Sequence, residues 1–213
     1  MLTKGVWTPV DGRQLTAEEK CRVIRSSMFI KEKFLSSGEF EKLKARLVVG
    51  GDQQDKNLYD DLSAPTVSTC SVLTVLSIAA HEGRFTAVVD IGGAFLNADM
   101  TTGITVHMSL DSTLSSLITR LDKSYSKYMD PKGKIVVKLN KALYGCVESA
   151  ALWYENLRET MKSLGYDRNP HGICVFNARN KHGVQYTATI HVDDLFISSA
   201  NPHMVNELCD GLK

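Results

Sequence analysis

The chain has 213 residues, of which 43% are hydrophobic and 23% are charged, and its formal net charge is +1. This balance is typical of a folded domain with a buried core; it excludes a disordered chain and offers no argument from charge alone for nucleic acid binding. The sequence has no apolar stretch of about 18 residues and no charged leader before an apolar run, so we expect a protein of the cytoplasm or nucleus rather than a membrane or secreted one.

The first predicted elements form a basic hairpin. Residues 21–34 ("CRVIRSSMFIKEKF") and 42–51 ("KLKARLVVGG") are rich in strand-forming side chains and flank the polar turn "SSGEFE". Gly50 and Gly51 end the second strand. The sequence therefore predicts two paired strands close to the N-terminus.

Three segments are predicted to be helices. Residues 66–82 carry apolar side chains at helical spacing after Pro65, with Gly83 as the stop. Residues 148–165 show a second apolar face, and the segment from residue 201 opens with an Asn-Pro pair typical of a helix start.

Short apolar segments between these helices are predicted to be strands. They cover residues 85–90, 104–110 and 134–140, followed by a run over 172–199 with a turn at 180–183. The order of elements, without internal repeats, predicts an α+β fold with a sheet packed on helices.

Two adjacent acids interrupt the last strand segment, "TIHVDDLFIS". Asp is disfavoured inside strands, so Asp193 and Asp194 mark either a solvated turn or a place where carboxylates face a divalent cation. A third acid, Asp90, ends the apolar strand "FTAVVD" just before two glycines. If the two strands are neighbours, three carboxylates converge, as they do around the metal ions of phosphoryl-transfer sites.

Five ordered blocks resemble the reverse transcriptase of copia-type LTR retrotransposons over about residues 20–213: "LKARLVVGG", "YDDLSAPTVS", "VVDIGGAFLNADM", "VVKLNKALYGCVESAALWY" and "HVDDLFIS". The resemblance implies the fingers and palm of a right-hand polymerase, with an antiparallel palm sheet packed on helices. Fingers are expected at about 20–65 and mostly palm at 66–213, with a surface helical insertion near 111–133. The family continues into a primer grip, thumb and RNase H, so we expect the thumb to be absent from residues 1–213.

The resemblance also implies an activity. It is that of an RNA-directed DNA polymerase, a nucleotidyltransferase that joins a dNTP to a primer 3′-hydroxyl with two Mg²⁺ ions, for which Mn²⁺ can substitute. The implied partners are an RNA or DNA template, a primer, dNTPs and the remainder of a pol polyprotein. The implied location is a cytoplasmic virus-like particle or the nucleus, without a membrane partner.

Carried over by position, the resemblance assigns the metal site first. Asp90, Asp193 and Asp194 are the implied catalytic carboxylates, with Asp90 and Asp193 as the main Mg²⁺ ligands and the backbone carbonyl of Ile91 as a further oxygen.

The resemblance likewise assigns the nucleotide-binding residues. Lys44 and Arg46 match the fingers positions that meet the triphosphate, where charge-assisted contacts offset negative charge. Phe95 matches the aromatic residue beneath the deoxyribose, where the 2′-hydroxyl of a ribonucleotide would collide. Glu148 stands at the nucleotide-facing position where the family has Gln.

Three departures from the family keep alternatives open. Besides Glu148, Ala150 replaces a Pro, and His191 replaces the Tyr that opens the last motif. A carboxylate beside a triphosphate weakens binding by repulsion unless a cation neutralises it. The alternative is a truncated or decayed retrotransposon-derived domain without catalysis that at most binds nucleic acid. An unrelated α+β binding module is favoured if Asp90 lies far from Asp193.

Overall fold

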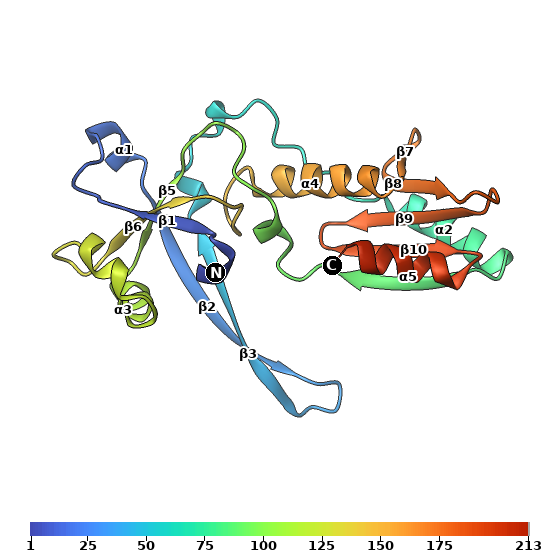
Figure 1. The fold of residues 1–213 in the computed structure, drawn as a ribbon, viewed down its shortest axis with the longest axis horizontal. Coiled ribbons are helices and arrows are strands. Elements are labelled where there is room, and N and C mark those ends of the chain that lie inside the picture. The colour runs from blue at the N-terminus through green and yellow to red at the C-terminus, as the bar shows by residue number, and fades with distance from the viewer. Residues whose placement is uncertain (213) are drawn as a thin grey trace. The chain divides into compact units, whose positions relative to one another are not determined.

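The computed structural model describes residues 1–212, which form a mixed α/β chain of two compact units (Figure 1). Unit 1 contains residues 1–62 and 95–152, and unit 2 contains residues 63–94 together with those from 153 onward. Each unit holds one five-stranded sheet. The α+β class expected from the sequence is confirmed at this level.

The sheet of unit 1 has the order β1-β6-β5-β2-β3. Its strands are β1 (Trp7–Val10), β2 (Ile24–Phe34), β3 (Phe40–Val49), β5 (His107–Leu110) and β6 (Ile135–Leu139). Neighbours are antiparallel except β2 and β5, which are parallel. Unit 1 also contains two α-helices, α1 (Ala17–Cys21) and α3 (Ser112–Leu121), and four 3₁₀ turns, η1 (Leu2–Lys4), η2 (Gly51–Gln53), η3 (Lys56–Leu58) and η5 (Lys123–Tyr128). A further turn, η4 (Ala94–Asn97), spans the boundary between the units.

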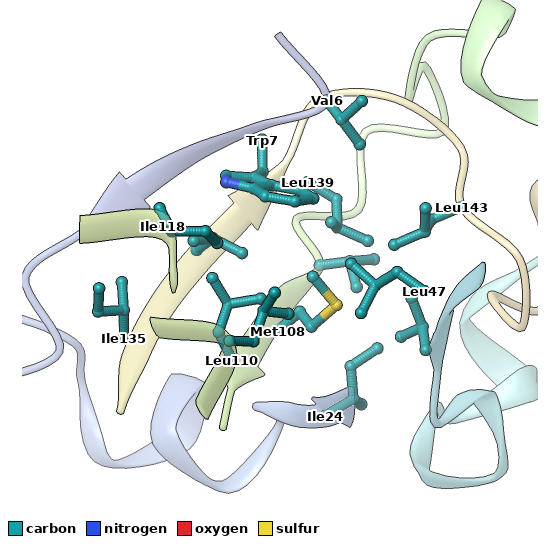
Figure 2. Close-up of a cluster of buried hydrophobic side chains, with 14 of the residues drawn as sticks. Val6, Trp7, Ile24, Leu47, Met108, Leu110, Ile118, Ile135, Leu139 and Leu143 are labelled. Atoms are coloured by element: carbon teal, nitrogen blue, oxygen red, sulfur yellow. The ribbon is translucent and has the colours of Figure 1, made fainter. Parts of the chain in front are cut away.

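The core of unit 1 gathers apolar side chains from the sheet and from α3 (Figure 2). Met108, Leu110 and Ile135 are fully buried, and Ile118 of α3 joins them. The segment near 111–133, expected to be a helical insertion at the surface, contains α3, whose residues are mostly exposed. Its amphipathic helix turns Leu114 and Ile118 into the core.

The sheet of unit 2 has the order β4-β10-β9-β8-β7 and is antiparallel throughout. Its strands are β4 (Phe85–Asp90), β7 (Asp167–Asn169), β8 (Gly172–Arg179), β9 (Gln185–His191) and β10 (Asp194–Ser199). Its helices are α2 (Thr69–His81), α5 (Pro202–Gly211) and most of α4 (Ser149–Ser163), which begins in unit 1. The predicted antiparallel sheet with accompanying helices is thus present.

Capping residues fix the predicted helices. The Ser68 hydroxyl accepts a hydrogen bond from the Ser71 amide at the start of α2, and Asn201 caps α5 in the same way through the His203 amide. Gly83, with a φ of 61°, follows the end of α2. Among residues 1–212, no helix combines the length and apolar character needed to cross a bilayer.

Candidate functional site

Asp90 and Asp194 lie directly opposite each other on neighbouring antiparallel strands. Strand β10 pairs with β4 along its whole length, and the register sets Asp194 against Asp90 at the end of both strands. Side chains that are directly opposite in such a pair share one face of the sheet, with Cβ atoms roughly 5 Å apart. The condition that the sequence left open, that the strands of these acids are neighbours, is met.

Asp193 lies in the tight turn that joins β9 to β10. His191 and Asp194 pair across the strands, which leaves Val192 and Asp193 as the two turn residues. Val192 has a φ of 58°, and it is the only non-glycine residue with positive φ among residues 1–212. Turns of two residues in hairpins need positive φ, which glycine or asparagine normally supplies.

Two hydrogen bonds hold this strained turn. The Ile91 amide donates to the Asp193 carbonyl at 2.9 Å, and the indole Nε1 of Trp153 donates to the Val192 carbonyl at 2.7 Å. A branched side chain at positive φ costs on the order of 1–3 kcal/mol, and such strain collects at functional sites. The turn therefore places Asp193 beside the end of β4, although its backbone conformation costs free energy.

The chemistry of the donor set suits a hard divalent cation. Asp90 and Asp194 are exposed, Asp193 is half-buried, and all three offer carboxylate oxygens, which Mg²⁺ prefers. Like charges directly opposite on a sheet repel, so a bound cation would remove a cost that the sequence otherwise carries. Within residues 1–212, however, no three His, Cys, Asp or Glu side chains are gathered into a ready-made metal cluster.

In unit 1, Lys44 and Arg46 lie on the same face of the long β2–β3 hairpin. The register pairs Lys44 with Lys31 and Arg46 with Phe29. Two pairs further along, and so on the same face, Lys33 lies opposite Lys42, which also forms an ion pair with Glu41 at 2.6 Å.

We call this side of the hairpin the cationic face; it consists of Lys31, Lys33, Lys42, Lys44 and Arg46. All five side chains are exposed. The opposite side of the hairpin carries Met28, Ile30 and Leu43 and continues into the core of unit 1 through Leu47. One side of the hairpin therefore suits a phosphate-bearing ligand.

The Tyr144 ring contacts two of the predicted nucleotide-binding residues. The guanidinium carbon of Arg46 lies 4.8 Å from the centroid of this ring. The Phe95 ring meets it edge to face, with centroids 4.5 Å apart. Arg46 and Phe95, which are far apart in sequence, are thus brought together on one aromatic side chain within unit 1.

Glu148 is buried rather than open to solvent, with 1% of its surface exposed. Its carboxylate accepts hydrogen bonds from the Tyr59 hydroxyl at 3.1 Å and from Gln54 Nε2 at 3.0 Å. The structure thus supplies neutral donors to this carboxylate. Its contact with a nucleotide stays a prediction.

The candidate residues fall into two sets. Asp90, Ile91, Asp193 and Asp194 belong to unit 2, whereas Lys44, Arg46, Phe95 and Glu148 belong to unit 1. Sequence reasoning missed four supporting residues, Gln54, Tyr59, Tyr144 and Trp153. The motif blocks contained Tyr59, Tyr144 and Trp153, but nothing in one sequence shows which backbone or side chain they contact.

Comparison with known proteins places these features in a family. Residues 20–213 match the family model described as "Reverse transcriptase (RNA-dependent DNA polymerase)". The chain is 28% identical over 182 residues to the retrovirus-related Pol polyprotein from transposon RE1 of Arabidopsis thaliana, covering 85% of this chain and 11% of that protein.

Two further polyproteins are similar. One, from transposon TNT 1-94 of Nicotiana tabacum, is 28% identical over 78% of this chain and 12% of its own length. The other, the transposon Ty1-MR1 Gag-Pol polyprotein of Saccharomyces cerevisiae, is 27% identical over 80% of this chain and 8% of its own length. The chain thus spans about a tenth of the length of the curated relatives that it matches.

Proposed function

The chain belongs to the reverse transcriptase family of copia-type retrotransposon polyproteins, and we propose that it forms the nucleotidyl-transfer core of an RNA-directed DNA polymerase. We assign about residues 20–65, which include the β2–β3 hairpin, to the fingers and residues 66–213, which include most of unit 2, mostly to the palm. The proposed partners are a primer, an RNA or DNA template, dNTPs and the remainder of a pol polyprotein. The proposed location is a virus-like particle or the nucleus.

One observation carries this proposal. Asp90 and Asp194 are directly opposite each other, and a strained turn sets Asp193 beside them. Packing gains nothing from this arrangement, because like charges repel across a strand pair. Bound divalent cations would offset this repulsion, which explains why three carboxylates lie together.

In the proposed reaction, the primer 3′-hydroxyl loses its proton to water, its oxygen bonds to the α-phosphorus of the dNTP, and the bond from that phosphorus to the departing pyrophosphate breaks. Asp90 and Asp193, with Asp194 and the Ile91 carbonyl, would hold Mg²⁺ or Mn²⁺. These ions stabilise charge on the attacking and leaving oxygens when bound. The chain's own contribution is to fix the carboxylates at the ends of two hydrogen-bonded strands.

The nucleotide-binding residues would act through charge and shape. Lys44 and Arg46 on the cationic face would bind the triphosphate and offset the charge of the departing pyrophosphate. Phe95 would form a wall beside the sugar that excludes the 2′-hydroxyl. Glu148 would join the nucleotide-binding residues because it stands at the position where the family has a nucleotide-facing Gln.

Metal-dependent dNTP binding tests the proposal. Residues 1–213 should bind a fluorescent dNTP analogue more tightly in Mg²⁺ than in EDTA, and Asp90→Asn or Asp193→Asn should remove this difference. Asp167→Asn is the matched control, because Asp167 is exposed on β7 at the other edge of the same sheet. An equal dNTP affinity in Mg²⁺ and in EDTA, and in the wild type and Asp90→Asn, would overturn the proposal.

A second candidate function is nucleic acid binding without catalysis. It is favoured by the cationic face, which can hold a phosphate backbone without any metal, and by the departures at Glu148 and His191. This candidate predicts salt-sensitive binding of single-stranded nucleic acid together with metal-independent, weak dNTP binding. The same titration therefore separates the two functions.

A further inference from the structure

The loop from Leu143 to Glu148 is docked, backbone to backbone, onto the end of β3. The Val49 amide donates to the Tyr144 carbonyl at 2.7 Å. Gly145 has a φ of 96°, and a Cβ atom there would lie 2.1 Å from the Val49 carbonyl oxygen. A Cβ on Gly51 would lie 1.9 Å from the Gly145 carbonyl oxygen. Only glycine allows this close approach at either position.

Glu148 fastens the far end of the same loop. Gln54 receives the Val147 amide on its Oε1 at 2.8 Å, and its Nε2 donates to Glu148 at 3.0 Å and to the Tyr59 hydroxyl at 2.8 Å. The Tyr59 hydroxyl in turn donates to the second oxygen of Glu148. The loop is thus tied to the segment that follows β3 by a closed network of side chains.

The direction of the hydrogen bonds in this network favours two acceptor oxygens at position 148. A carboxylate accepts on both oxygens, whereas Gln accepts on one alone, so the Tyr59 hydroxyl would lose the acceptor of its proton. Burial, and then the charge of Glu148, raises the pKa of Tyr59, so its hydroxyl keeps the proton that it donates. The same two causes raise the pKa of the Cys146 thiol to about 12, so that a second neighbour stays uncharged.

The docked loop carries Tyr144, and Tyr144 contacts both Arg46 and Phe95. A shift of the loop along β3 would therefore move the Tyr144 ring. Arg46, which is predicted to bind the triphosphate, and Phe95, which is predicted to exclude the 2′-hydroxyl, both contact this ring. Misplacement of about 1 Å at such a site can cost about a hundredfold in rate.

We propose that Glu148 is a positioning residue: its buried carboxylate, held by Gln54 and Tyr59, fixes the loop from Leu143 to Glu148 and thereby sets Arg46 and Phe95 against Tyr144. This inference rests on the proposed function for its consequence, but its geometry can be tested without any nucleotide. It also accounts for a Glu at the position where the family has Gln, because Gln54 and Tyr59 present matching donors.

The test measures side-chain proton chemical shifts of Arg46 and Phe95 by NMR, because the Tyr144 ring current shifts protons held against its face or edge. Glu148→Gln should move both sets of shifts toward values typical of an unstructured chain. The double variant Gln54→Glu/Glu148→Gln exchanges acceptor and amide and should restore part of the native shifts. Tyr59→Phe removes one donor at a half-buried position and should give a smaller change in the same direction.

Glu207→Gln is the control, because Glu207 is an exposed carboxylate on α5. Native shifts of Arg46 and Phe95 in both Glu148→Gln and Tyr59→Phe would overturn the positioning role. If Glu148→Gln changes the chemical shifts and the double variant Gln54→Glu/Glu148→Gln restores none of them, the role of hydrogen-bond direction is overturned.

A second readout joins the network to the nucleotide. Glu148→Gln should weaken dNTP binding about tenfold and lower the preference for dNTP over rNTP, and the exchanged pair should recover part of both effects. A general loss of stability would lower both affinities without changing their ratio, and an unchanged ratio would overturn the positioning of Phe95. If the wild type binds no dNTP at all, the proposed function fails, while the NMR shifts still decide the geometry.

Discussion

Asp194 lies directly opposite Asp90 across the β4–β10 strand pair, so two carboxylates share the end of one sheet face. In the absence of a divalent cation their repulsion opposes folding. We predict that Asp90→Asn raises the free energy of unfolding by up to about 1 kcal/mol in EDTA, measured by urea denaturation at low salt.

The same variant should lose stability relative to the wild type when Mg²⁺ is added, because only the wild type gains from binding the ion. Asp167→Asn should respond to neither condition. If Asp90→Asn destabilises the chain in EDTA, the carboxylate has a structural role that the strand register does not reveal.

We expect the strained turn at Val192, which places Asp193, to lower the free energy of unfolding. Val192 has a φ of 58°, and glycine adopts this conformation without strain. Val192→Gly should therefore raise the melting temperature, with a gain of about 1 kcal/mol after the entropy of the added glycine is subtracted. A lower melting temperature would show that the Val192 side chain makes contacts worth more than the strain.

The cationic face is expected to bind the phosphate backbone of single-stranded nucleic acid beyond the two residues assigned to the triphosphate. Lys31 and Lys33 lie opposite Lys44 and Lys42. The double variant Lys31→Ala/Lys33→Ala should weaken binding and reduce the slope of log affinity against log salt by about 1.4, which is about 0.7 for each lost phosphate contact.

Lys132→Ala supplies the control for that measurement, because Lys132 is an exposed cation of unit 1 that lies outside the hairpin. An equal fall in slope for Lys132→Ala would mean that net charge, rather than the cationic face, controls binding.

Phe95 is expected to set sugar choice. Its ring packs edge to face on Tyr144 at 4.5 Å, which holds it in one orientation. Phe95→Val should raise rNTP affinity relative to dNTP by more than about tenfold, the factor that 1.4 kcal/mol gives. The measurement is a pair of equilibrium titrations with matched fluorescent analogues. An unchanged ratio with intact dNTP binding would make Phe95 an ordinary packing residue.

The sequence predicted the elements whose signals are local. Helix α2 has a Ser cap and a glycine stop, although its buried residues are Val75 and Ala79 while Leu73 and Leu76 are exposed. The β2–β3 hairpin has two long runs of strand formers around a polar turn. The acids of the β9–β10 turn were also visible, because Asp interrupts a run of strand formers.

The missed elements depend on distant partners. Strand β1 has four residues and a proline, and it exists because β6 pairs with it more than a hundred residues away. Helix α1 is an exception: its five residues are held by a local capping box between Thr16 and Glu19, a signal present in the sequence. Within the insertion expected near 111–133, the sequence did not show which face of the helix packs on the core; the structure buries Leu114 and Ile118 of α3 and exposes most of its other residues.

The candidate site divides in the same way. A single sequence indicates which residue types suit a metal or a triphosphate, and the family resemblance assigns positions. Tertiary contacts alone show that Trp153 donates a hydrogen bond to the Val192 carbonyl. The same holds for Tyr59 and Gln54, which donate to Glu148.

We propose that Asp90, Asp193 and Asp194 together hold divalent cations, and anomalous X-ray scattering from crystals of residues 1–213 soaked in Mn²⁺ and a dNTP would locate these ions. We predict an anomalous peak within about 2.5 Å of carboxylate oxygens from both β4 and the β9–β10 turn, and its loss in Asp90→Asn. Mn²⁺ that binds the triphosphate alone, with no carboxylate of these three residues as a ligand, would show that they do not form the metal site.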